Sequence, residues 1–165
     1  MSYAQILKSL CCGDAVEGGL SEHDAGLLFG AMLDGGVPEL ELGALLVALQ
    51  VRPMSLAELS GYTGAINERL FRLTPPPAKA LPVVLPSYGG ARDGPNLLPL
   101  LALLLQRFNV PVVVHGMLNG DGSIASAYVF RELGVMPCAS LAQAQAALAK
   151  PGIAFAPTAV LAPGL

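Results

Sequence analysis

The sequence predicts an α/β fold preceded by a helical subdomain, and three observations lead to this prediction. Residues 1–73 carry apolar side chains at helical spacing. Three consecutive prolines at 75–77 then interrupt the pattern and favour an extended spacer. Beyond them, short apolar runs alternate with helical segments, which is typical of a parallel sheet. We therefore expect a helical subdomain at 1–73, a proline-rich linker at 74–82 and an α/β domain at 83–165.

Capping signals predict the helices of the first subdomain. Residues 21–24 (SEHD) and 55–58 (SLAE) have the spacing of capping boxes. The first opens an apolar stripe that the sequence DGG at 34–36 ends, and the second starts a helix that we expect to run to about Arg72. Between them, Pro38 starts a helix with four leucines on one face: Leu42, Leu45, Leu46 and Leu49.

The second half of the chain predicts a parallel sheet. Strands are expected near 83–85, 112–114 and 153–155, and helices near 96–108, 125–133 and 140–149. A three-stranded parallel sheet leaves faces and edges uncovered, so we interpret the chain as the front portion of a longer protein.

Glycines follow two of the expected strands. Gly89 and Gly90 come after the first strand, and Gly116 ends the second. Ligands of parallel sheets bind beyond the carboxyl ends of the strands, where small residues let a ligand approach backbone N–H groups. The alternative is that these glycines only form the turn from strand to helix. His115 is likewise either a ligand contact or, as we favour, a structural hydrogen-bonding residue.

Composition excludes several classes of protein. The chain is 53% hydrophobic, but its longest apolar run, 97–105, is interrupted by Pro99 and is too short to cross a membrane. No signal peptide is evident, and three cysteines do not form a disulfide framework, so we expect a cytoplasmic protein. Residues 1–80 have a net charge of −4 and residues 81–165 of +1, which is not the basic stripe of a dedicated DNA-binding protein. No set of metal ligands is visible.

Four blocks in order resemble a known family. They are AMLDGGVPELELGALLVAL (31–49), VVLPSYGGAR (83–92), PNLLPLLALLL (95–105) and VPVVVHG (110–116). The chain resembles the N-terminal half of an anthranilate phosphoribosyltransferase-like protein of the glycosyl transferase family 3 group, in a divergent branch. The resemblance implies a partial parallel sheet of the nucleoside phosphorylase and phosphoribosyltransferase type. It also implies magnesium-dependent transfer of phosphoribose to an amine, and a homodimer through the helical subdomain. Members of the branch are described as binding DNA without sequence preference.

The resemblance also implies a phosphate or pyrophosphate site. Its residues would be Gly89, Gly90, Asn96, His115, Gly116 and Ser126, with Arg92 as a further anion contact. Departures from the family pattern weaken this site. Ala91 replaces an acid, Leu98 and Pro99 replace two hydroxyl residues, and Val114 replaces a lysine. The acidic pair that binds magnesium in the family lies beyond Leu165, so this chain has no metal site and no catalytic residue that we can name.

Two function classes follow from these departures. The first is a phosphoribosyltransferase-like protein with a degenerate site that is inactive as this chain. The second is a non-catalytic, sequence-independent nucleic-acid-binding protein on the same scaffold. The expected partners are a second copy of the chain, a phosphate-containing small molecule and, for the second class, nucleic acid; no membrane contact is expected.

Overall fold

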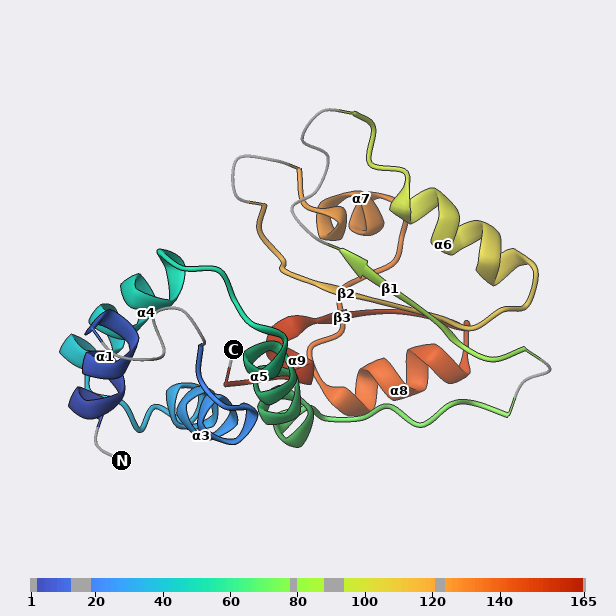
Figure 1. The fold of residues 1–165 in the computed structure, drawn as a ribbon. Coiled ribbons are helices and arrows are strands. Elements are labelled where there is room, and N and C mark those ends of the chain that lie inside the picture. The colour runs from blue at the N-terminus through green and yellow to red at the C-terminus, as the bar shows by residue number, and fades with distance from the viewer. Residues whose placement is uncertain (1–2, 13–18, 78–79, 88–93, 121–123, 165) are drawn as a thin grey trace. The chain divides into compact units, whose positions relative to one another are not determined.

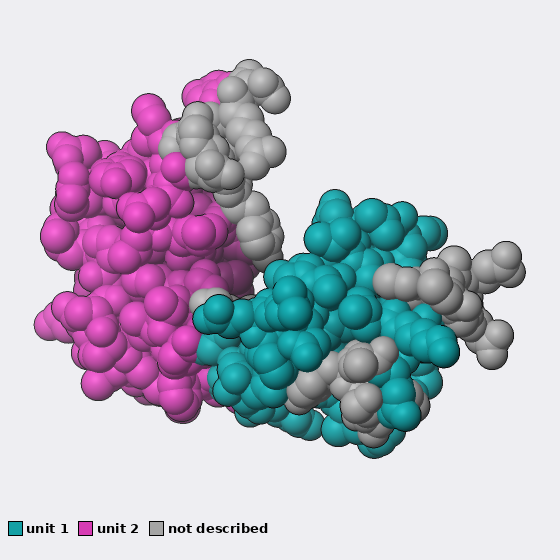
Figure 2. All heavy atoms as spheres, turned by 90° about the vertical axis from the view of Figure 1, so that its left-hand side faces the viewer, with its two compact units in different colours: residues 1–70, 164 teal, residues 71–163, 165 magenta. Residues whose placement is uncertain are grey.

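The computed structural model describes residues 3–12, 19–77, 80–87, 94–120 and 124–164. Its contacts divide the chain into two compact units, coloured separately in Figure 2. Unit 1 comprises residues 1–70 and 164, and unit 2 comprises residues 71–163 and 165.

Unit 1 is helical in the part that the structure describes (Figure 1). Its helices are α1 (Tyr3–Cys12), α3 (Glu22–Leu33), α4 (Glu39–Gln50) and α5 (Leu56–Arg69). Helix α3 packs against α5, and α1 packs against α4. Burial of the apolar faces of these helices forms one core, which contains Ile6, Leu10, Ala25, Leu28, Leu45 and Tyr62.

The two predicted capping boxes have different outcomes. At α5 the box is complete, because Glu58 N donates to Ser55 Oγ and Ser55 N donates to Glu58 Oε2. At α3 Ser21 caps the helix through Asp24 N, but the Asp24 carboxylate accepts from Ser21 Oγ instead of from the backbone. The prediction of a full box there was wrong, because aspartate is one methylene shorter than the glutamate that the motif requires.

Two further details of unit 1 differ from the expectation. Leu46 is 52% exposed, because the buried face of α4 follows Leu45 and Ala48 and is too narrow to include it. Helix α5 ends at Arg69 and not near Arg72. The reason is a tertiary contact. Phe71 N donates to Leu161 O and therefore does not donate to a carbonyl of the preceding helical turn.

The proline segment is attached to unit 2. Thr74 N donates to Gln145 Oε1 and Thr74 O accepts from Gln145 Nε2, both at 2.7 Å. These bonds fix the segment to helix α8 (Leu141–Ala149). The contacts therefore place the boundary between Leu70 and Phe71, before the prolines.

Unit 2 contains a parallel sheet with helices on both faces (Figure 1). Strands β1 (Val83–Ser87), β2 (Val112–Gly116) and β3 (Ile153–Pro157) lie in the order β1-β2-β3. Helices α6 (Leu98–Arg107), α7 (Ser126–Glu132) and α9 (Thr158–Leu161) complete the unit with α8. The prediction of α/β architecture with a helical N-terminal part and a three-stranded parallel sheet is confirmed.

Alternation along the strands separates two apolar clusters. On one face, Val112 and Val114 of β2 pack with α6 and with Phe130 of α7. On the other face, Val113 packs with Ala144 and Leu148 of α8. The face that carries α6 and α7 is the one on which the candidate site lies. Over the described residues, no helix is long and apolar enough to cross a membrane.

Candidate functional site

The carboxyl ends of β1 and β2 lie side by side. In the parallel register, Ser87 is paired with Gly116. Ser87 lies two residues after Leu85 on β1, and Gly116 lies two residues after Val114 on β2, so each faces the same side of the sheet as that residue. Leu85 and Val114 pack into the apolar cluster beneath α6 and α7. The strand ends therefore present Ser87 and Gly116 on the same face of the sheet.

Ser126 joins this edge to the start of α6. Its Oγ accepts from Ser87 Oγ at 2.7 Å and from Asn96 Nδ2 at 2.8 Å. Asn96 precedes α6, and Ser126 is the first residue of α7. Ser126 is only 2% exposed, whereas Ser87 and Asn96 are half-buried. The three polar side chains thus form one hydrogen-bonded cluster from three parts of the chain.

Gly116 is in the site for steric reasons. A Cβ at this position would lie 2.5 Å from Ser87 O and 2.9 Å from Ser87 Cβ. Such approaches are far inside van der Waals contact, so only glycine lets β1 and β2 come together here without displacing Ser87. Gly116 therefore supports the Ser87 end of the cluster.

His115 lies apart from this cluster. It pairs with Pro86 and Ala156, and alternation directs it to the face that carries α8. Partial burial lowers the pKa of His115 below its usual value, so its imidazole is neutral near pH 7. The structure brings together Asn96, Gly116 and Ser126 of the predicted residues, and places His115 on the opposite face.

Three predicted residues lie outside the described part of the chain. They are Gly89, Gly90 and Arg92. Ser87 and Asn96 lie on either side of these three residues in the sequence, and both have described geometry.

Two of the positions that depart from the family pattern are buried in the structure. Val114 is fully buried among the side chains beneath α6 and α7, and Pro99 is buried in the first turn of α6. Among the described residues, no three His, Cys, Asp or Glu side chains form a group that could hold a metal ion.

Ser87 is the member of the cluster that sequence reasoning missed as a site residue. Its partner Ser126 is 39 residues away, and no local pattern reports that pairing. The available signal was its place at the carboxyl end of an apolar run.

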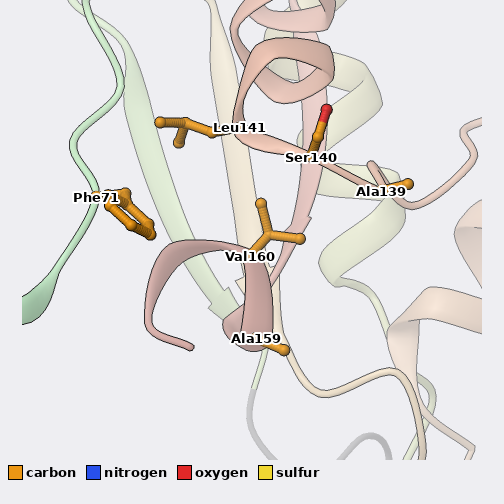
Figure 3. A pocket seen from close by; sticks show the side chains of 6 residues that line it. All are labelled: Phe71, Ala139, Ser140, Leu141, Ala159 and Val160. Atoms are coloured by element: carbon orange, nitrogen blue, oxygen red, sulfur yellow. The ribbon is translucent and has the colours of Figure 1, made fainter. Parts of the chain in front are cut away.

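A separate pocket lies at the other face of unit 2 (Figure 3). It has a volume of about 300 Å³ and is lined mainly by apolar side chains from residue 71, the start of α8 and α9. The hydroxyl of Ser140 in its wall accepts from Gln143 N and so caps α8. None of the predicted site residues lines this pocket.

Comparisons with known proteins agree with this architecture. Residues 4–69 match the family described as "Glycosyl transferase family, helical bundle domain". The crystal structure of anthranilate phosphoribosyltransferase from Thermus thermophilus is 24% identical to this chain, with a TM-score of 0.73 over 96% of this chain and 46% of that one. At this identity the likeness concerns the fold.

Sequence relatives give the same class. The chain is 33% identical over 139 residues to anthranilate phosphoribosyltransferase of Synechococcus sp. strain JA-3-3Ab, covering 82% of this chain and 39% of the relative. It is 38% identical over 165 residues to the uncharacterized protein YbiB of Escherichia coli K12, covering 100% of this chain and 52% of that protein. The chain belongs to the anthranilate phosphoribosyltransferase-like group of the glycosyl transferase family. It spans about half the length, or less, of the relatives that it matches.

Proposed function

We propose that this chain is a phosphoribosyltransferase-like protein that binds a phosphate group at the ends of β1 and β2 and does not transfer phosphoribose on its own. The cluster of Ser87, Asn96 and Ser126 at the carboxyl ends of parallel strands supports binding. The Asn96 amide gives one N–H to Ser126 Oγ, and its second N–H remains to donate to a phosphate oxygen. Ser87 gives its single O–H to Ser126 Oγ and lies beside Asn96 at the same edge, and both side chains are partly accessible.

The lack of turnover follows from the charges that transfer requires. A departing pyrophosphate is stabilised mainly by cationic groups and metal ions. Val114 is buried and uncharged at the position of the family lysine, and the described residues contain no group of three His, Cys, Asp or Glu side chains that could hold a metal. Each lost charge-assisted contact costs about 1.5–3 kcal/mol, so several losses together reduce binding and rate by orders of magnitude.

One pair of assays tests both halves of this proposal. The purified chain is incubated with phosphoribosyl pyrophosphate, magnesium and anthranilate, with the Synechococcus enzyme as positive control, and we expect product only in the control. Inorganic pyrophosphate is then titrated into the ¹⁵N-labelled chain, and we expect saturable shifts at Ser87 and Asn96. Measurable turnover would contradict the proposed lack of transfer. Unsaturable or absent shifts would contradict the proposed phosphate binding.

A matched pair of variants localises the binding. Asn96→Ala removes an amide from the cluster, whereas Gln106→Ala removes an amide at the far end of α6, where it donates to Pro151 O. Pyrophosphate affinity should fall in the first variant by about tenfold, the equivalent of one hydrogen bond, and stay unchanged in the second. Equal effects would place the anion elsewhere.

Nucleic-acid binding is the second candidate, and the charge of unit 2 favours it. Unit 2 contains six basic and three acidic residues, a net charge of +3, whereas unit 1 has a net charge of −6. The guanidinium of Arg131 lies over the Tyr128 ring at 5.3 Å, and both side chains are exposed. Such a pair offers a charge for phosphates and a ring for stacking on bases. This candidate, like the first, assumes a cytoplasmic location.

Fluorescence anisotropy with two oligonucleotides of unrelated sequence tests this candidate. Equal affinities that weaken with salt would support it. Arg131→Gln should weaken binding to both oligonucleotides, and Lys8→Gln in unit 1 should weaken neither. Strong preference for one sequence, or no binding at low salt, would contradict it.

A further inference from the structure

Ser126 differs from a ligand-binding residue in how its hydroxyl is used. The side chain is 2% exposed, and its oxygen accepts from both Ser87 Oγ and Asn96 Nδ2. Both lone pairs of this oxygen are therefore used within the protein. Because the protein covers the side chain almost completely, a phosphate group in solution does not reach it.

The hydroxyl does not cap its helix either. Ser126 is the first residue of α7, the N-cap residue is Ala125, and no side chain caps that end. A buried hydroxyl is costly unless it is hydrogen-bonded, and here its bonds go to two other segments of the chain. They join the last residue of β1 to the residue two positions before α6.

We propose that Ser126 is a positioning residue, which holds the Ser87 and Asn96 side chains at the strand ends and does not contact the ligand itself. This role rests on the proposed function for the identity of the ligand, a phosphate group. The two hydrogen bonds that Ser126 accepts do not depend on it. Without the hydrogen bonds to Ser126 Oγ, the Ser87 and Asn96 side chains would be free to take other rotamers. Affinity would then fall because ordering them on binding costs entropy.

The test compares Ser126→Thr with Ser126→Val, two variants of nearly identical shape that differ by one hydroxyl. The first readout needs no ligand: the Asn96 side-chain NH₂ resonances in the free ¹⁵N-labelled chain. We expect them at their wild-type positions in Ser126→Thr and shifted toward those of an unbonded amide in Ser126→Val. Asn96 resonances that are the same in both variants would overturn the proposal.

The second readout is affinity for inorganic pyrophosphate. We expect Ser126→Val to bind about tenfold more weakly than Ser126→Thr, the equivalent of one hydrogen bond. Ser140→Ala is the stability control, because Ser140 caps α8 and should cost stability without changing affinity. Equal affinities of the Thr and Val variants would overturn the positioning role.

Failure of the proposed function is recognised separately. If the wild-type chain does not bind pyrophosphate, the proposed function and the ligand half of this inference are both overturned. The Asn96 resonances still decide in that case whether Ser126 holds the cluster. If the extra methyl group of Thr or Val overfills this buried position and the variant does not fold, Ser126→Ala compared with the wild type carries both readouts.

Discussion

At the scale of single residues, Glu58 is a buried and fully hydrogen-bonded side chain of unit 1. Its carboxylate is completely buried, is paired with Arg52 and accepts from Leu20 N and Ser55 N at 2.9 Å each. Burial alone raises the pKa of Glu58, but the Arg52 guanidinium and the two backbone N–H groups outweigh it and lower the pKa to about 2. One side chain thus joins three segments of unit 1.

Glu58 should make the stability of the chain depend on pH in acid. Because its pKa is lower in the folded than in the unfolded chain, the stabilisation is complete above the unfolded value of 4.5 and is lost as the pH falls to about 2. The size of this effect is about 3 kcal/mol. Denaturant unfolding followed by circular dichroism at intervals from pH 7 down to 2 measures it.

Glu58→Gln is the corresponding variant. It should lose about 3–5 kcal/mol at pH 7, because Arg52 is left buried without its partner. Its stability should also change less than that of the wild type between pH 5 and 2. Asp34 is exposed and its pKa is lowered by its hydrogen bond with Arg69, so it contributes in both proteins alike. Parallel pH profiles would contradict the assignment.

Gly116 makes a second prediction at this scale. Gly116→Ala should cost about 1–3 kcal/mol of unfolding free energy, because the new Cβ meets Ser87 O at 2.5 Å and the two strands must separate. Gly43→Ala is the control, since a Cβ at Gly43 meets nothing within 4 Å and alanine favours the helix by about 0.5–1 kcal/mol. Chemical denaturation of both variants decides, and a neutral Gly116→Ala would contradict the steric explanation.

At the scale of elements, the contact between α3 and α5 depends on a glycine. A Cβ at Gly61 would lie 2.3 Å from Glu22 O and 2.8 Å from Gly26 N, so α5 packs directly against the backbone of α3. Gly61→Ala should therefore destabilise unit 1 by about 1–3 kcal/mol. Gly64→Ala, three residues later on the same helix, has open space and should stabilise by about 0.5–1 kcal/mol. The thermal midpoint of unfolding should fall in Gly61→Ala and rise in Gly64→Ala. Shifts of the same sign in both variants would contradict the steric explanation.

Elements with strong local signals are predictable from the sequence, and their ends are not. The three strands were recognised from apolar runs, and Gly116 was expected to end the second. The first and third strands extend two residues further than expected, to Ser87 and Pro157. These terminal residues are not strand formers by composition. They are extended because they pair with one another in register, which is a property of the sheet.

The site was predictable to the same extent. Asn96, Gly116 and Ser126 were named by resemblance, and the structure places them at one edge. The separation of His115 from them follows from alternation, because adjacent residues of a strand face opposite ways. The bond between Ser87 and Ser126 has no local signal, since it depends on how α7 packs on the sheet.

At the scale of the whole molecule, helices α3 and α4 of unit 1 carry exposed apolar side chains, in the subdomain for which the resemblance implies a homodimer. Leu27 is 60% exposed, Leu46 52% and Val47 64%. Exposed apolar side chains on helices are candidates for an interface, and a two-fold symmetric dimer buries the same surface twice. We therefore expect a dimer through α3 and α4.

Light scattering at micromolar concentration, coupled to size-exclusion chromatography, tests this assembly. The wild-type chain should have twice the mass of 16.9 kDa, and Val47→Glu should shift it to the monomer, because a dimer would have to bury the new charge. Leu101→Glu places the same charge on an exposed apolar position of α6 in unit 2 and should leave the dimer intact. Circular dichroism confirms that both variants stay folded, as expected for exposed positions. A monomeric wild type would refute the dimer, whereas dissociation by Leu101→Glu but not by Val47→Glu would move the interface from the helical unit to α6.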